Sequence, residues 1–183
     1  IPRGSQQLID TVRQNSLVPV IETGAGVCHV YVHKEASLQK ALQIVENAKT
    51  SRPSVCNAMD TLLVDKTIAV KFLPQVAERF LKHKVEVYAD EKAFSLLKAY
   101  PYLLTASAGD FGKEFLSLKC SVKVVNDFDQ AMDHIQKYST KHSEAIVSEN
   151  KEICERFMNE VDAAVVYANA STRFTDGEEF GLG

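Results

Sequence analysis

"VCHVYVHKEASLQKALQIVENAK", residues 27–49, places a strand pattern directly before a helix pattern. Residues 27–33 are a β-branched and aromatic run, which predicts a strand. Ser37 is suited to the N-cap of the helix that follows. Apolar residues recur at helical spacing on one face of that helix: Leu38, Ala41, Leu42, Val45 and Ala48. The stretch therefore predicts a strand joined to an amphipathic helix.

The same alternation continues along the rest of the chain. Further strands are expected at residues 17–23, 61–65, 85–89, 120–125, 144–148 and 163–169. Helices are expected at about residues 66–82, 91–100, 127–139 and 150–161, with Pro74 marking a kink or a late start in the first of these. Strands separated by helices require crossovers, which favour parallel pairing. The sequence predicts a doubly wound α/β domain, a mainly parallel sheet with helices on both faces.

Composition narrows the function classes. The chain has 183 residues, of which 45% are hydrophobic and 25% charged, with a formal net charge of −3. This balance argues against nucleic acid as a partner, and no apolar run reaches the roughly 20 residues of a membrane span. The four cysteines are too widely spaced for a metal or redox motif and are expected as free thiols in the cytoplasm. The chain begins at Ile1 and stops at "EEFGLG", and we expect it to be part of a longer polypeptide.

Cys56 is the first candidate for chemistry. It stands in "RPSVCNAMDTLLV", residues 52–64, between a proline and an apolar strand. A thiolate is a strong nucleophile, and Asn57 could add an amide donor for an oxyanion. The other interpretation is a buried, inert cysteine that packs against the strand. The pattern alone leaves both open.

Other candidate residues lie in loops. In "ETGAG", residues 22–26, Glu22 could act as a general base and the glycines allow close backbone approach. Gly4 and Ser5 open a helix whose N-terminus could bind phosphate. Residues 169–174, "NASTRF", follow the last strand and combine polar groups suited to an anion: Asn169, Ser171, Thr172 and Arg173. His142 precedes another strand and could be structural or catalytic.

In doubly wound sheets, ligands bind outside the carboxyl ends of the strands. That rule favours residues 22–26 and 169–177 as ligand loops. Cys56 lies instead in the connection that leads into a strand. The sheet rule alone therefore places it outside the site.

Taken together, "IPRGSQQL", "VCHVYV", "CNAMDTLLV", "HSEAIVS" and "NASTRFTDG" resemble the gamma-glutamyl phosphate reductases, a family of the aldehyde dehydrogenase superfamily. The resemblance implies NADPH-dependent reduction of L-glutamate 5-phosphate to the semialdehyde, with release of phosphate, in proline biosynthesis. Cys56 stands at the position of the family's nucleophile, which forms a thioester. Glu22 stands where the superfamily has a catalytic glutamate.

The resemblance also implies binding roles. Glu114 resembles the glutamate that touches the nicotinamide ribose, and Gly4 and Ser5 resemble the turn against the dinucleotide. Asn169, Ser171, Thr172, Arg173 and His142 resemble substrate-binding residues, with Arg173 on an anionic group. Asp60 and Glu144 depart from the family pattern but keep its charge.

The resemblance implies three parts of a longer enzyme. Residues 1–24 would be the end of the NADPH-binding domain, residues 25–170 the catalytic domain, and residues 171–183 a segment returning toward the cofactor and oligomerisation region. Most of the NADP-binding domain would lie outside the chain, which would be inactive alone. Expected partners are glutamyl 5-phosphate, further copies of the enzyme and, through the pathway, glutamate 5-kinase. Two alternatives remain, the reductase part of a bifunctional pyrroline-5-carboxylate synthase and a non-catalytic α/β anion-binding module.

Overall fold

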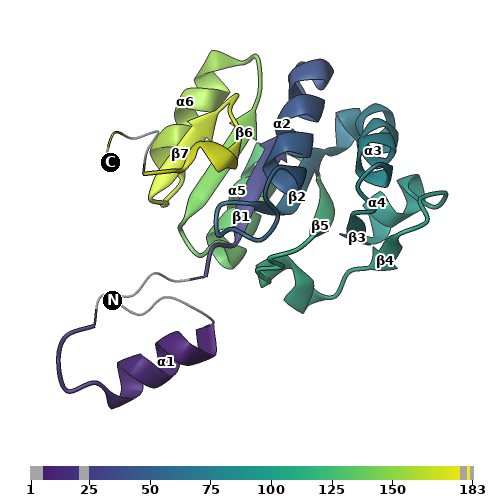
Figure 1. The fold of residues 1–183 in the computed structure, drawn as a ribbon. Coiled ribbons are helices and arrows are strands. Elements are labelled where there is room, and N and C mark those ends of the chain that lie inside the picture. Colours follow the sequence, from purple (N-terminus) through teal and green to yellow (C-terminus); the bar gives the residue numbers. More distant parts are fainter. Residues whose placement is uncertain (1–5, 21–24, 178–180, 182–183) are drawn as a thin grey trace.

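The computed structural model describes residues 6–20, 25–177 and 181. Seven strands form one sheet in the order β4-β3-β5-β2-β1-β6-β7 (Figure 1). The strands are β1 (Cys28–Val32), β2 (Met59–Asp65), β3 (Glu86–Ala89), β4 (Leu103–Thr105), β5 (Lys119–Val125), β6 (Ser143–Val147) and β7 (Val165–Ala168). Every pairing between them is parallel. The α/β sheet expected from the sequence is confirmed.

Helices α2 (Leu38–Thr50), α3 (Lys66–Leu81), α4 (Glu91–Leu96), α5 (Phe128–Tyr138) and α6 (Lys151–Glu160) cover the two faces of the sheet. A further helix, α1 (Gln6–Asn15), precedes β1 and is not part of these layers (Figure 1). One apolar core lies between the sheet and α2, α3 and α4, and a second lies between the sheet and α5 and α6 (Figure 1). β1 and β2 are buried along their whole length, as expected for strands covered on both faces.

Helix starts follow local capping chemistry. Four helices begin after an Asp or Asn whose side chain accepts a hydrogen bond from a backbone N–H in the first turn: Asp65, Asp90, Asp127 and Asn150. Ser37 occupies the N-cap of α2 as expected, but its hydroxyl makes no capping bond. Pro74 lies inside α3 rather than at its start.

Three local predictions need correction. No strand forms at residues 17–20 of the segment expected as 17–23; the remainder of that segment lies outside the described residues. α4 ends at Leu96 rather than near residue 100. The short strand β4 was not predicted, because three residues are too few to show a period and two of them, Leu104 and Thr105, are exposed.

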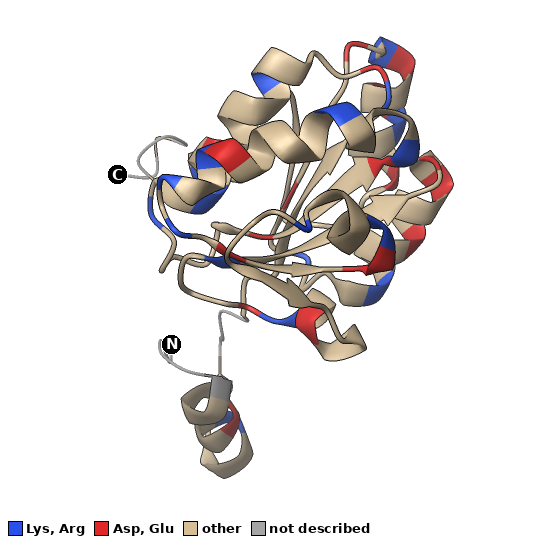
Figure 2. Cartoon of the chain, turned by 90° about the vertical axis from the view of Figure 1, so that its right-hand side faces the viewer, with Lys and Arg blue, Asp and Glu red and all other residues tan. Residues whose placement is uncertain are grey.

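Over the described ranges, no helix is long and apolar enough to span a bilayer. Basic and acidic residues are interspersed over the helices and loops (Figure 2).

Candidate active site

The candidate site lies at the amino edge of the sheet, where the loops before β1, β2, β5 and β6 meet. The backbone N–H of Gly26, before β1, donates to Glu114 Oε1 in the loop before β5, at 2.8 Å. The N–H of Val27 donates to Thr140 Oγ1, before β6, at 2.9 Å. These bonds join loops that are 88 and 113 residues apart in sequence. The sheet order, rather than the local sequence, brings them together.

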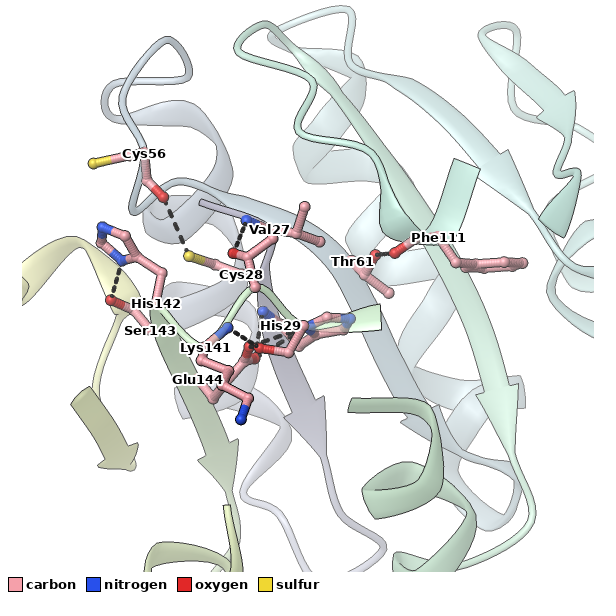
Figure 3. Close-up of polar contacts among 12 residues, drawn as sticks. Val27, Cys28, His29, Cys56, Thr61, Phe111, Lys141, His142, Ser143 and Glu144 are labelled. Atoms are coloured by element: carbon pink, nitrogen blue, oxygen red, sulfur yellow. Dashed lines mark hydrogen bonds and ion pairs between the residues drawn. The ribbon is translucent and has the colours of Figure 1, made fainter. Parts of the chain in front are cut away.

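Cys56 stands in this edge, in the turn before β2, and is exposed. Its carbonyl oxygen accepts a hydrogen bond from Cys28 Sγ at 3.3 Å (Figure 3). A Cβ atom at Gly26 would lie 1.8 Å from that same oxygen, so only glycine fits there. Burial of the thiol raises the pKa of Cys56, Glu114 adds to the rise and Arg173 opposes it. Cys56 is thus an accessible thiol held on a fixed backbone.

The other three cysteines are buried. Burial raises the pKa of Cys28 well above its ordinary value, and raises that of Cys120 to about 12. The pKa of Cys154 is also raised by burial. The interpretation of an inert packing thiol therefore fits these three cysteines and does not fit Cys56.

Asn57 and Arg173 tie the segment that follows β7 to the Cys56 loop. One Arg173 terminal nitrogen donates to Asn57 Oδ1, and Arg173 Nε donates to Ser51 Oγ at 3.3 Å. Asn57 Nδ2 donates to the carbonyl of Thr175 at 2.6 Å. Both ends of the Asn57 amide are therefore engaged by protein. These bonds fix the orientation of the Asn57 amide, and its Nδ2 group keeps one further N–H.

His142 and Ser143 lie at the start of β6, on the same edge. His142 Nδ1 and Ser143 Oγ are 2.8 Å apart (Figure 3), and Ser143 Oγ is 2.8 Å from Thr175 Oγ1. Tyr167 OH is 3.1 Å from the same Thr175 hydroxyl. Burial lowers the pKa of His142, which favours the neutral imidazole. Thr175 is a centre of this network; it lies within the "NASTRFTDG" stretch but was not named there as a candidate residue.

The "NASTRF" residues divide between the two edges of the sheet. Asn169 lies at the carboxyl edge, where its amide bonds the backbone N–H and carbonyl of Ser148 at 3.0 and 2.9 Å. Ser171 accepts from the backbone N–H of Arg173 at 3.2 Å, and Thr172 is buried. Arg173 alone among them contacts the Cys56 loop. Gly4, Ser5 and Glu22 lie outside the described residues.

Buried charged groups underlie the site. Glu144 accepts from the His29 backbone N–H at 2.7 Å and from Ser139 Oγ at 2.5 Å, and lies 3.0 Å from His29 Nδ1 (Figure 3). Asp60 accepts from the Phe115 backbone N–H at 2.9 Å and lies 3.7 Å from Lys49 Nζ. Burial raises the pKa of Asp60 to about 6. Glu144 therefore fixes the backbone at the start of β1, and Asp60 fixes the backbone of the loop before β5.

A hollow of about 660 Å³ lies elsewhere, between α5 and α6. Most of its charged side chains pair with one another. Arg156 lies 2.8 Å from Asp129 and 2.7 Å from Glu160, and Lys141 pairs with Asp162. Because these charges are mutually satisfied and none belongs to the Cys56 network, we place the site at the amino edge.

The fold of the described chain is that of an aldehyde dehydrogenase-like protein. An acetylating aldehyde dehydrogenase from Geobacillus thermoglucosidasius matches with a TM-score of 0.72 and 20% identity, over 96% of this chain and 47% of that one. At this identity the match shows the fold alone. The sequence matches no protein-family model.

Nearer relatives are gamma-glutamyl phosphate reductases. That of Petrotoga mobilis is 56% identical over 100% of this chain and 43% of its own length. That of Clostridium acetobutylicum is 55% identical over the same shares. The crystal structure of the Thermotoga maritima protein matches with a TM-score of 0.93 and 49% identity, over 98% of this chain and 43% of that one. The resemblance in the motifs is confirmed: the chain is a homologue of the gamma-glutamyl phosphate reductases and spans about two fifths of their length.

Proposed function

We propose that this chain carries the thiol-bearing catalytic part of a gamma-glutamyl phosphate reductase. The reaction would be the NADPH-dependent conversion of L-glutamate 5-phosphate to L-glutamate 5-semialdehyde and phosphate, in cytoplasmic proline biosynthesis. The observation that carries the proposal is Cys56, the one exposed thiol among the described cysteines, fixed by its neighbours at the edge where five segments meet. We take residues 25–170 as the catalytic domain, with the flanking segments leading toward the cofactor domain.

In the first step, the Cys56 thiolate attacks the acyl carbon of the substrate. A carbon–sulfur bond forms, the carbon–oxygen bond to phosphate breaks, and phosphate leaves with the electron pair. Since burial raises the pKa of the Cys56 thiol, a positive charge is needed to favour the thiolate. Arg173 supplies that charge from this chain, and its pKa is itself lowered by burial.

In the second step, the thioester is reduced and Cys56 is released. Bound NADPH would supply the hydride. Glu114 fits the expected ribose contact, because it is half-buried, lies beside the Cys56 loop, and uses Oε1 for Gly26 while Oε2 makes no hydrogen bond to the described residues. The resulting thiohemiacetal collapses with cleavage of the carbon–sulfur bond, which frees the aldehyde and returns the thiolate of Cys56. Homo-oligomerisation and cooperation with glutamate 5-kinase are expected of the whole enzyme.

Alkylation tests the nucleophile on this chain. Iodoacetamide at neutral pH should label Cys56 well before Cys28, Cys120 or Cys154, because only Cys56 is exposed. Peptide mass spectrometry measures the order, and Cys56→Ser is the control for assignment. Slower or equal labelling of Cys56 would contradict the proposal and favour a non-catalytic anion-binding module.

Activity is tested in the longer protein that contains this sequence. Assayed in reverse with semialdehyde, phosphate and NADP, Cys56→Ser should abolish turnover and Cys28→Ser should retain it. Substantial activity in Cys56→Ser would refute the thioester mechanism. Arg173→Ala should weaken substrate binding by about 1.5–3 kcal/mol, the usual size of a charged hydrogen bond. An unchanged KM and kcat would remove Arg173 from the site.

A further inference from the structure

Two arginines meet at the end of α2 beside Cys56. Arg52 follows the C-cap residue Ser51, and Arg173 donates its Nε to Ser51 Oγ. The same Arg173 guanidinium reaches Asn57, the residue after Cys56. The two cations therefore span the loop that carries the thiol, one from within the loop and one from the segment after β7.

The described residues balance these two charges only poorly. Arg52 is exposed and makes no hydrogen bond or ion pair to any described residue. Arg173 donates to a hydroxyl and an amide, both neutral. Burial lowers the pKa of Arg173, and Arg52 lowers it further, as expected for like charges close together, while Asp176 and Cys56 act in the opposite direction. Elsewhere in the described chain, Arg79 and Arg156 pair with glutamates.

We propose that Arg52 and Arg173 together bind the phosphate of the acyl-phosphate substrate, with Arg52 as a further specificity-determining residue. This inference rests on the proposed function. Guanidinium groups match the geometry of phosphate oxygens, and two of them suit a doubly charged group. Phosphate is attached to the carbon that Cys56 attacks, whereas three further carbons separate that carbon from the α-carboxylate of the substrate. Arg173, which reaches the residue next to Cys56, and Arg52, four positions before Cys56 in the same loop, are therefore placed for the phosphate.

The pair gives the reaction two advantages. Before attack, it draws the anionic substrate to the thiol and supports the thiolate. During attack, charge builds up on the departing phosphate oxygen as the carbon–oxygen bond breaks. Fixed positive charge at that oxygen stabilises the transition state more than the ground state. Loss of Arg52 should therefore affect phosphate recognition rather than the fold.

Paired alkylating reagents test the local charge on this chain. Iodoacetate is anionic and iodoacetamide is neutral, so the ratio of their rates at Cys56 reports the local positive potential. Arg52→Gln and Arg173→Gln should each lower that ratio several-fold. Lys71→Gln removes the same charge from an exposed position on α3 and should leave the ratio unchanged. A ratio unchanged in Arg52→Gln would overturn the inference.

Protection by ligands identifies the anion. Inorganic phosphate should slow alkylation of Cys56 in the wild-type chain and lose most of that effect in Arg52→Gln. Protection by L-glutamate that depends on Arg52, without protection by phosphate, would assign the pair to the α-carboxylate and refute the phosphate assignment. If Arg52 only stabilises the end of α2, Arg52→Gln would lower Tm and leave ratio and protection unchanged, which also refutes it. These outcomes are separate from failure of the proposed function, which would appear as an unreactive Cys56.

Discussion

The carboxyl and amino edges of the sheet use polar residues differently. At the carboxyl edge, the side chains are occupied in holding the fold. Asp65, Asp90, Asp127 and Asn150 cap helices, and Asn169 bonds the backbone of Ser148. At the amino edge, Cys56 and Arg52 are exposed and Arg173 keeps donor capacity.

This difference explains why the usual rule for doubly wound sheets misleads here. Ligands favour the carboxyl edge because helix N-termini offer N–H groups there. In this chain, aspartate and asparagine caps already accept those N–H groups at four helices. The amino edge instead gathers loops around a thiol and two guanidinium groups. The side chains that can still bind a ligand therefore lie at the amino edge, where they do not cap helices.

Among substitutions at the amino edge, we expect Gly26→Ala to have the largest effect on stability. The new Cβ would lie 1.8 Å from the Cys56 carbonyl oxygen, and backbone on both sides cannot move aside cheaply. We expect a loss of about 3 kcal/mol in the free energy of unfolding, measured by urea denaturation. Gly177→Ala is the matched control, because a Cβ there meets no atom within 4 Å. Equal effects of the two substitutions would show that the close approach at Gly26 is not needed.

Asn169→Ala tests whether Asn169 stabilises the carboxyl edge of the sheet rather than taking part in the site. It removes two hydrogen bonds to Ser148 and leaves a residue with φ of 57° without the asparagine side chain that favours it. We expect a loss of about 2 kcal/mol in stability with unchanged alkylation of Cys56. A stable variant with altered Cys56 reactivity would place Asn169 in the site after all.

A third prediction concerns His134, a buried histidine that packs against the amino end of β1. Its ring packs against His29 and Phe111, and neither ring nitrogen has a hydrogen-bond partner among the described residues. Burial lowers the pKa of His134 to about 2. The unfolded chain therefore binds a proton that the folded chain does not, and stability is lost as the pH falls below about 6.5.

At pH 5 this loss should reach about 2 kcal/mol relative to pH 7.5. In His134→Phe the difference between the two pH values should shrink by that amount, whatever the absolute stability of the variant. Urea titrations of both proteins at both pH values measure it. An identical pH dependence in the two proteins would mean that His134 titrates normally in the fold.

The smallest effect concerns a single cap at the carboxyl edge. Asp127→Ala removes the acceptor for the Gln130 backbone N–H at 3.0 Å and should cost about 1 kcal/mol. Ser37→Ala is the control, since Ser37 occupies an N-cap without a capping bond and should be nearly neutral. If both substitutions lower the free energy of unfolding equally, the capping bond of Asp127 does not contribute to the stability of the carboxyl edge.

Much of the fold was predictable, because the deciding signals are local. The strand expected at residues 27–33 contains β1, the one expected at 61–65 is the greater part of β2 (Met59–Asp65), and Asp127 caps α5 as its position before an amphipathic run predicts. The strand expected at residues 17–23 rested on composition alone, and no strand forms at residues 17–20. The candidate site was harder, because its residues contact one another across more than a hundred positions, as Arg173 and Asn57 do.

By itself, the sequence determined the alternation of strands and helices and singled out Cys56 as a candidate, because side-chain periodicity and motif chemistry act over a few neighbouring residues. It could not decide between a reactive and a buried thiol. Tertiary structure made Cys56 accessible and buried the other three cysteines. It also brought Arg173 and Thr175 to the amino edge, where Asn57 binds both. Strand order and the path of the chain after β7 fix these contacts, and both are set by packing between distant segments.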